Sequence, residues 1–224
     1  MDDEKQIRWV GSAYDDLLAF PNDARKEAGF QLGKVQAGLE PADWKPFDDV
    51  ECGYEREIRI RDASGIYRVM YVAKFEEAIY VRHCFRKKTQ ATGKQDKAIA
   101  AARYRRGQRE EGEEMKVDTE IRHVTKPGAN LFLELGFTPD EAKRLQAASR
   151  KQINDTRLLK QELMEELSVW IADHHLKQAE AAEILMVSRP RVSDVVNKKT
   201  GKFTIDTLVE MLSRVGKPVK LAIS

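Results

Sequence analysis

Cysteine, net charge and long apolar runs are all scarce in this sequence. Only two cysteines, Cys52 and Cys84, occur in 224 residues, which excludes a small scaffold held by several disulfides and predicts two reduced thiols in strands. No stretch approaches the roughly 20 apolar residues that a membrane-spanning helix needs. The acidic residues 1–4 lack the profile of a signal peptide. We therefore expect a cytoplasmic protein that has no membrane partner.

Patterns that would indicate a metal site are also missing. Two distant cysteines and the four histidines, His83, His123, His174 and His175, form no recognisable spacing of zinc ligands. We therefore expect no metal and no other cofactor.

The net charge is only +2, but the charges are unevenly distributed along the chain. Between Arg82 and Arg109 there are ten lysines and arginines and a single acidic residue, Asp96. Four glutamates then follow within residues 110–114, in a segment (107–116) that has almost no apolar side chains. A basic stretch before an acidic linker predicts a polyanion-binding region that ends at a domain boundary.

The first half of the chain predicts an α+β fold with an antiparallel meander of strands. In the run 55–61, Glu55, Glu57 and Arg59 alternate with Ile58 and Ile60, so the charged and apolar side chains should lie on opposite faces. The expected elements are a strand at 7–10, helices near 15–18 and 23–36, strands at 55–61, 66–74 and 78–85, and a basic helix at 95–106.

The second half predicts an all-α region. Thr138-Pro139-Asp140-Glu141 has the composition of a helix start. The expected helices run from 138 to 151, then from a cap at Asn154-Asp155 along a longer segment, and then over 177–187, 189–198 and 204–215. Residues 217–223 alternate like a strand, which either pairs across a dimer or is a frayed tail.

Two of these helices have the spacing of a DNA-binding helix-turn-helix. The small Ala182 lets two helices cross closely, Leu185 and Val192 fix the turn, and Ser188 begins the second helix so that its first residues point into the major groove. The candidate DNA-binding residues, which mix base-reading and phosphate-binding types, are Gln178, Ser188, Arg189, Arg191, Ser193, Asn197, Lys198 and Lys199. The other interpretation is a helical hairpin with a solvated polar face.

This region resembles the antitoxin branch of the Xre/Cro-like family. The resemblance covers about residues 126–224, and the segment Asn130-Leu131-Phe132-Leu133-Glu134-Leu135-Gly136-Phe137 is similar to one that HigA-type antitoxins often carry ahead of the motif. Met186 departs from the pattern, because the family usually has glycine in the turn. A left-handed backbone there would cost a methionine on the order of 1 kcal/mol.

Arginines on adjacent strands of the first half, followed by Arg86-Lys87-Lys88, predict a cationic sheet face. Fixed positive charge stabilises the extra negative charge of a phosphoryl-transfer transition state, and guanidinium groups add planar contacts to phosphate. A ribonuclease that uses the 2′-hydroxyl of its substrate needs no metal, but it needs a proton donor and acceptor.

This half, from about residue 7 to 106, resembles the phage-derived branch of the RelE/HigB toxin superfamily. The resemblance rests on the order βααβββα, on Gly65-x-Tyr67-Arg68-x-x-Tyr71 and on Phe85-x-Lys87-Lys88-x-Gln90. It implies a ribosome-dependent endoribonuclease that cleaves mRNA. The implied roles are phosphate contact for Arg59 and Arg68, phosphate or ribosomal RNA contact for Lys87 and Lys88, and proton transfer or base stacking for Tyr71 or His83.

Each of these residues also has a purely structural interpretation. The arginines could form ion pairs with Glu55 or Glu57, and His83 could be a histidine whose hydrogen bonds are satisfied within the sheet.

Together the halves predict an α+β RelE-like domain (1–109), an acidic linker and connecting segment (110–130), and a HigA-like all-α region (131–224) whose helix-turn-helix core is 155–216. The resulting hypothesis is a single-chain toxin–antitoxin protein. Its expected partners are mRNA on the ribosome, operator DNA and a second copy in a homodimer, with an intramolecular or intersubunit contact that restrains the toxin. The alternatives are a regulator whose first half is an inactive toxin fold used for dimerisation or sensing, and a fusion made in the laboratory.

Overall fold

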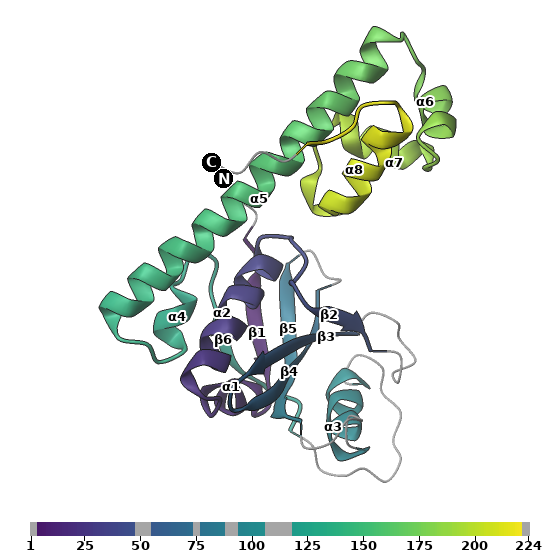
Figure 1. Cartoon of the computed structure of the whole chain (residues 1–224). Helices are drawn as coiled ribbons and strands as arrows, with labels where there is room; N and C mark the ends of the chain where they lie inside the picture. Colours follow the sequence, from purple (N-terminus) through teal and green to yellow (C-terminus); the bar gives the residue numbers. More distant parts are fainter. Residues whose placement is uncertain (1–3, 48–54, 74–76, 88–93, 106–117, 221–224) are drawn as a thin grey trace. The chain divides into compact units, whose positions relative to one another are not determined.

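The computed structural model describes residues 4–47, 55–73, 77–87, 94–105 and 118–220. The chain forms two compact units, Met1–Arg150 and Lys151–Ser224 (Figure 1). No described helix is both long and apolar enough to cross a membrane. The described residues also contain no group of three or more histidines, cysteines or carboxylates that could hold a metal ion.

A six-stranded mixed sheet organises the first unit, in the order β2-β3-β4-β5-β1-β6. The expected meander is present, because β3 (Glu55–Asp62), β4 (Gly65–Val72) and β5 (Ala78–Arg86) pair antiparallel. The strand β1 (Gln6–Val10) pairs parallel with β5. Two short strands form the edges of the sheet: β2 (Trp44–Pro46), beside β3, and β6 (Ile121–Thr125), beside β1.

The two faces of this sheet differ in what covers them. The main apolar core includes Ile58, Ile60 and Val69 of the sheet and buried side chains of α1 (Ala13–Leu18) and α2 (Asn22–Gln36). The opposite face carries the charged side chains of β3, as the alternation predicted. On this face the described residues form one small apolar cluster. The helix α3 (Lys94–Arg105) contributes Ala100 to it. This second face is therefore largely polar.

The segment after the linker is part of the first unit. The short helix α4 (Leu131–Glu134) and the residues that follow it add six side chains to the main core, namely Leu131, Phe132, Leu135, Phe137, Ala142 and Leu145. The packing is close, since a Cβ added at Gly29 of α2 would lie 2.6 Å from the Phe132 ring. Residues 131–150, which we predicted to belong to the HigA-like region, thus pack with the toxin-like fold; their assignment to that region stays a prediction.

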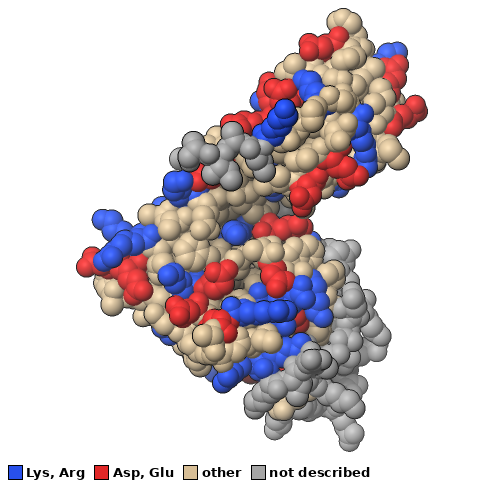
Figure 2. Space-filling model, in the orientation of Figure 1, with Lys and Arg blue, Asp and Glu red and all other residues tan. Residues whose placement is uncertain are grey.

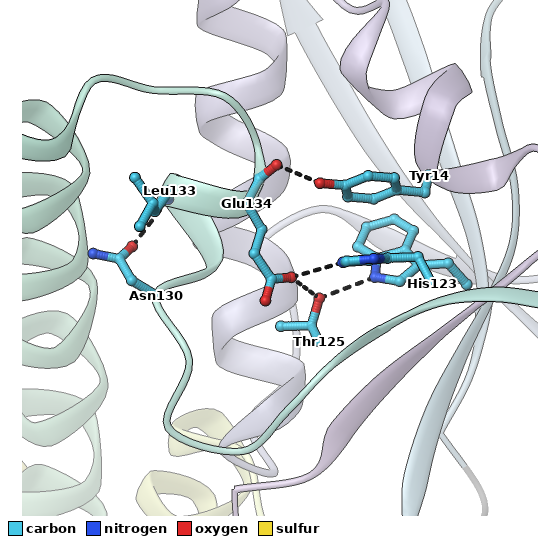
Figure 3. A network of polar contacts seen from close by, with 7 residues as sticks. Tyr14, His123, Thr125, Asn130, Leu133 and Glu134 are labelled. Atoms are coloured by element: carbon cyan, nitrogen blue, oxygen red, sulfur yellow. Dashed lines mark hydrogen bonds and ion pairs between the residues drawn. The ribbon is translucent and has the colours of Figure 1, made fainter.

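Hydrogen bonds fix this segment against β1 and α1 (Figure 3). One carboxylate oxygen of Glu134 accepts from Thr125 at 2.5 Å and lies 2.9 Å from His123 Nε2. Thr125 Oγ1 in turn accepts from the Trp9 indole at 3.1 Å. The Tyr14 hydroxyl donates to the Glu134 carbonyl at 2.5 Å, and its ring stacks on His123. Burial, followed by the charge of Glu134, raises the pKa of Tyr14.

The second unit is helical around its own apolar core. Leu163, Leu167 and Ile171 of α5 (Pro139–Asp173) pack with α6 (Gln178–Ile184), α7 (Arg189–Val196) and α8 (Ile205–Arg214). The expected helix-turn-helix arrangement of α6 and α7 is thus present.

One expectation about this half is wrong. The helix expected to end near Lys151 continues through Asn154 to Asp173. Asp155 does not cap a new helix there, because it pairs with Lys151 one turn earlier, at 2.6 Å. In the single chain residues 217–220 form no strand, and Lys217 pairs with Glu166 at 2.9 Å; pairing of this segment across a dimer stays a prediction. Residues 221–223 of the expected strand lie outside the described part of the chain.

Candidate functional site

Four cations from different strands share the polar face of the first unit. Arg59 on β3 lies opposite Arg68 on β4, and directly opposite residues in an antiparallel pair share a face. Lys45 on β2 lies opposite Glu57, two residues from Arg59. Lys87 follows β5, next to these residues. Lysine and arginine side chains gather over the strands of this unit in Figure 2, interspersed with acidic ones.

Arg68 is an internal member of this group. Its side chain is 4% exposed and its Nε lies 2.7 Å from the Glu57 carboxylate, which is 1% exposed. One terminal nitrogen donates to the Tyr67 carbonyl at 2.9 Å. Burial lowers the pKa of Arg68, and Glu57 opposes that shift. The ion pair with Glu57 that we considered as a structural role for this arginine is therefore present.

Arg59 and Lys87 are the more accessible members among the predicted residues. Arg59 pairs with Asp43 at 2.6 Å, and its side chain is 32% exposed. Lys87 is half-buried. Burial, followed by the charge of Arg68, lowers the pKa of Lys87, and Lys45 and Arg59 add to this effect. The charges of these cations therefore influence one another.

His83 lies on the same face but is enclosed. It is 7% exposed and stacks on Phe85. Its Nε2 lies 3.1 Å from Asp96 of α3, and its Nδ1 lies 3.8 Å from Asp16 of α1. The histidine thus lies between residues of two helices, and its contacts are not made within the sheet, as the structural interpretation supposed.

The structure does not bring Tyr71 to this face. Tyr71 alternates with Met70, is fully buried in the main core, and has a pKa that burial raises to about 12. Lys88 lies outside the described residues. The catalytic roles of these residues stay predictions.

Glu55 is a buried carboxyl that the sequence did not select as a site residue. It is 1% exposed, and its oxygens accept no hydrogen bond from the described residues. Burial raises its pKa from 4.5 to about 7, and Arg82 opposes the shift. Glu55 and Glu57 are therefore both buried acids on one face of the sheet.

The second unit presents the expected recognition helix. Ser188 precedes α7, with Pro190 in its first turn, and the turn residue Met186 has a φ of 52°. The left-handed conformation anticipated for this methionine is therefore present. Gln178, Ser188, Arg189 and Asn197 are exposed.

Most of the candidate DNA-binding side chains also make intramolecular contacts. Lys198 pairs with Glu165 at 2.5 Å and Lys199 with Asp194 at 2.9 Å. Arg191 lies over the Phe203 ring, 4.4 Å from its centroid. The side-chain amide of Asn197 donates to Ser193 at 2.8 Å. Arg189 forms no ion pair with any described residue, so it is the most available cation of α7.

Comparison with protein families assigns both regions. Residues 15–105 match the family described as phage derived protein Gp49-like, and residues 146–224 match a helix-turn-helix domain family. Searches of curated proteins and of solved structures found no match. The chain therefore joins a Gp49-like region, of the RelE-like toxin class, to an Xre-type helix-turn-helix region, the arrangement expected of a toxin–antitoxin fusion.

Proposed function

We propose that this chain is a self-contained toxin–antitoxin protein. Its first unit is a metal-independent endoribonuclease that cleaves mRNA on the ribosome. Its helix-turn-helix binds an inverted repeat in the protein's own promoter as a homodimer and represses transcription. The antitoxin-like region restrains the nuclease in the intact chain.

One observation supports the pairing of these activities. The segment that precedes the helix-turn-helix is packed into the Gp49-like fold by six core side chains and by the Glu134 hydrogen bonds. An antitoxin acts by binding its toxin, and we propose that this packing is an intramolecular counterpart of such a contact. A tether of this sort gives the contact a high effective concentration.

The cationic face supports the nuclease. Arg59, Lys45 and Lys87 can stabilise a phosphodiester whose negative charge increases in the transition state. Guanidinium contacts of Arg59 would orient the phosphate for attack by the 2′-hydroxyl.

The position of β6 in the sheet argues against one way of restraining the nuclease, in which this strand would cover the cationic face. The strand β6 lies at one edge of the sheet, whereas Arg59, Arg68 and Lys45 lie on β3, β4 and β2 at the other. The described residues of β6 therefore do not cover the cationic face by extending the sheet. We propose that the restraint comes from the antitoxin-like region and not from β6.

Growth after induced expression of three forms tests this function. Residues 1–150 should arrest growth and cleave mRNA, the full chain should do so less, and Arg59→Ala in residues 1–150 should relieve the arrest. Residues 1–109 are a poor toxin fragment because they lack six side chains of the core. Equal arrest by residues 1–150 and the full chain would contradict restraint.

The second candidate function is a regulator that uses an inactive toxin fold for dimerisation or sensing. The burial of Arg68 against Glu57 favours it, because that guanidinium does not face solvent. A folded 1–150 fragment that neither arrests growth nor cleaves RNA would decide for this candidate.

DNA binding has its own test. Arg189→Ala should weaken binding to the promoter fragment by roughly 1–3 kcal/mol if this arginine reads a base. Arg214→Ala is a suitable control, because Arg214 is occupied by the Leu185 carbonyl and by Glu210. An unchanged gel shift with Arg189→Ala would place the reading surface elsewhere.

A further inference from the structure

Lys45, on the edge strand β2, is a cation that no motif in the sequence identified. We propose that it binds a backbone phosphate of single-stranded RNA beside Arg59 and Lys87. The proposal rests on the nuclease function of the first unit and adds a substrate contact to it.

Strand register places Lys45 on the polar face. Lys45 lies directly opposite Glu57 on β3, and Glu57 lies directly opposite Met70 on β4. Directly opposite residues point to the same side of an antiparallel sheet. Arg59 and Arg68 lie on that side two residue pairs further along β3 and β4. Lys45 therefore extends the cationic group to the edge of the sheet.

The four cations of the polar face differ in how far their side chains are exposed to solvent. Lys45 is exposed, the Arg59 side chain is 32% exposed and Lys87 is half-buried, whereas Arg68 is only 4% exposed. Neither Lys45 nor Lys87 forms an ion pair within the described ranges. These ammonium groups are thus free to bind an external anion.

The electrostatics show that these cations act on one another. Burial lowers the pKa of Lys87, and the charges of Arg68, Lys45 and Arg59 lower it further, against the effect of Glu57. A group of mutually repelling cations is stabilised when an anion binds among them. An RNA backbone supplies such anions at regular spacing, and compact lysine ammonium groups suit contacts that do not depend on sequence.

This arrangement gives Arg68 a different role from that of Lys45. Because Arg68 is enclosed and paired with Glu57 at 2.7 Å, it is a positioning residue that fixes the adjacent strands. The accessible cations then make the direct phosphate contacts.

The salt dependence of RNA binding tests the proposal on the full chain. The probe is a fluorescein-labelled oligouridine, and the anisotropy titration is repeated over a series of potassium chloride concentrations. Each lost phosphate contact on a single strand should make the plot of log Kd against log salt shallower by about 0.7. Lys45→Ala should show this change and Lys45→Arg should retain the original slope.

Lys126→Ala is the matched control. Lys126 is also exposed and follows β6, at the opposite edge of the same sheet. It should leave the slope unchanged. Any RNA binding by the helix-turn-helix contributes equally to all variants and cancels in this comparison.

The outcomes separate this proposal from the proposed function. Equal slopes for Lys45→Ala and Lys126→Ala overturn the Lys45 contact, even if the chain cleaves RNA. A shallower slope for Lys45→Ala, together with a folded 1–150 fragment that neither arrests growth nor cleaves mRNA, supports the contact and contradicts the nuclease. Absence of RNA binding by the unaltered chain overturns the contact as well.

Discussion

The two units of this chain differ in the features that cost them stability: buried charges in the first unit and left-handed backbone conformations in the second. The first unit buries charged side chains, namely Glu55, Glu57, Arg68 and Arg82, beneath its polar face. Its left-handed backbone positions among the described residues are all glycines. The second unit has only Lys160 as a described buried charge, but three of its left-handed residues, His175, Met186 and Lys198, are not glycine.

This difference follows what each unit is built to present. A phosphate-binding surface needs fixed cations, and fixing them beside a sheet buries both the cations and their counter-ions. A helix-turn-helix needs abrupt turns between short helices. In this chain, the three turns that precede α6, that join α6 to α7 and that follow α7 each use a residue with a side chain. In both units the unfavourable terms lie next to the proposed binding surface.

The largest expected effect tests the buried charge of the first unit. Glu57→Ala leaves Arg68 buried without its counter-ion, which should destabilise the unit by about 3–5 kcal/mol. Glu40→Ala is the control, because its pair with Arg56 is exposed and should contribute at most about 1 kcal/mol. Hydrogen exchange measured by mass spectrometry should show faster exchange in the first unit alone. Similar losses for the two variants would remove the distinction between buried and exposed charge.

Glu55 should have a smaller effect on the free energy of unfolding, and this effect should depend on pH. Its pKa in the folded protein is about 7, above its ordinary 4.5, so the folded state binds the proton more tightly than the unfolded state. The stability that this proton provides is present below about pH 4.5 and is lost as the pH rises to about 7; the loss is at most about 3 kcal/mol.

Glu55→Gln should remove this dependence. The measurement is the free energy of unfolding in urea at pH 5 and pH 8, for the unaltered chain and for the variant. The unaltered chain should lose more stability than the variant between these values. An identical pH dependence in both proteins would show that Glu55 is ionised in the folded state throughout.

The smallest effect tests the backbone strain of the second unit. Met186→Gly should stabilise that unit by about 1 kcal/mol, because glycine adopts the left-handed conformation without a Cβ clash. Met186→Ala keeps the Cβ and is the control, since the Met186 side chain is 74% exposed and contributes little packing. Hydrogen exchange of α6, α7 and α8, measured by mass spectrometry, should separate them. Equal stability of the glycine and alanine variants would argue against strain at this turn.

The alternation of the sequence was enough to predict the two faces of β3. It placed Ile58 and Ile60 in the core and Glu57 with Arg59 on the other side, as observed. The helix-turn-helix was also predictable, because Ala182, Leu185 and Val192 all belong to one local packing pattern and are all buried.

Features that depend on long-range pairing were not predictable. Lys45 lies in a three-residue strand that includes Pro46, so its place on the polar face comes only from register with β3. The strand β6 pairs with β1, which is more than a hundred residues earlier in the chain. Asn154 and Asp155 resembled a helix start locally, but both lie within the continuous helix α5.

The packing of Phe132 and its neighbours also determines when the first unit can be completed during synthesis. A nascent chain that ends at residue 109 contains the cationic strands but none of the six core side chains between Leu131 and Leu145. Domains fold as units while the chain emerges from the ribosome. A message cut between the codons for residues 109 and 131 therefore yields an incomplete fold, and the first unit is complete only after Leu145, directly before the helix-turn-helix match begins at residue 146.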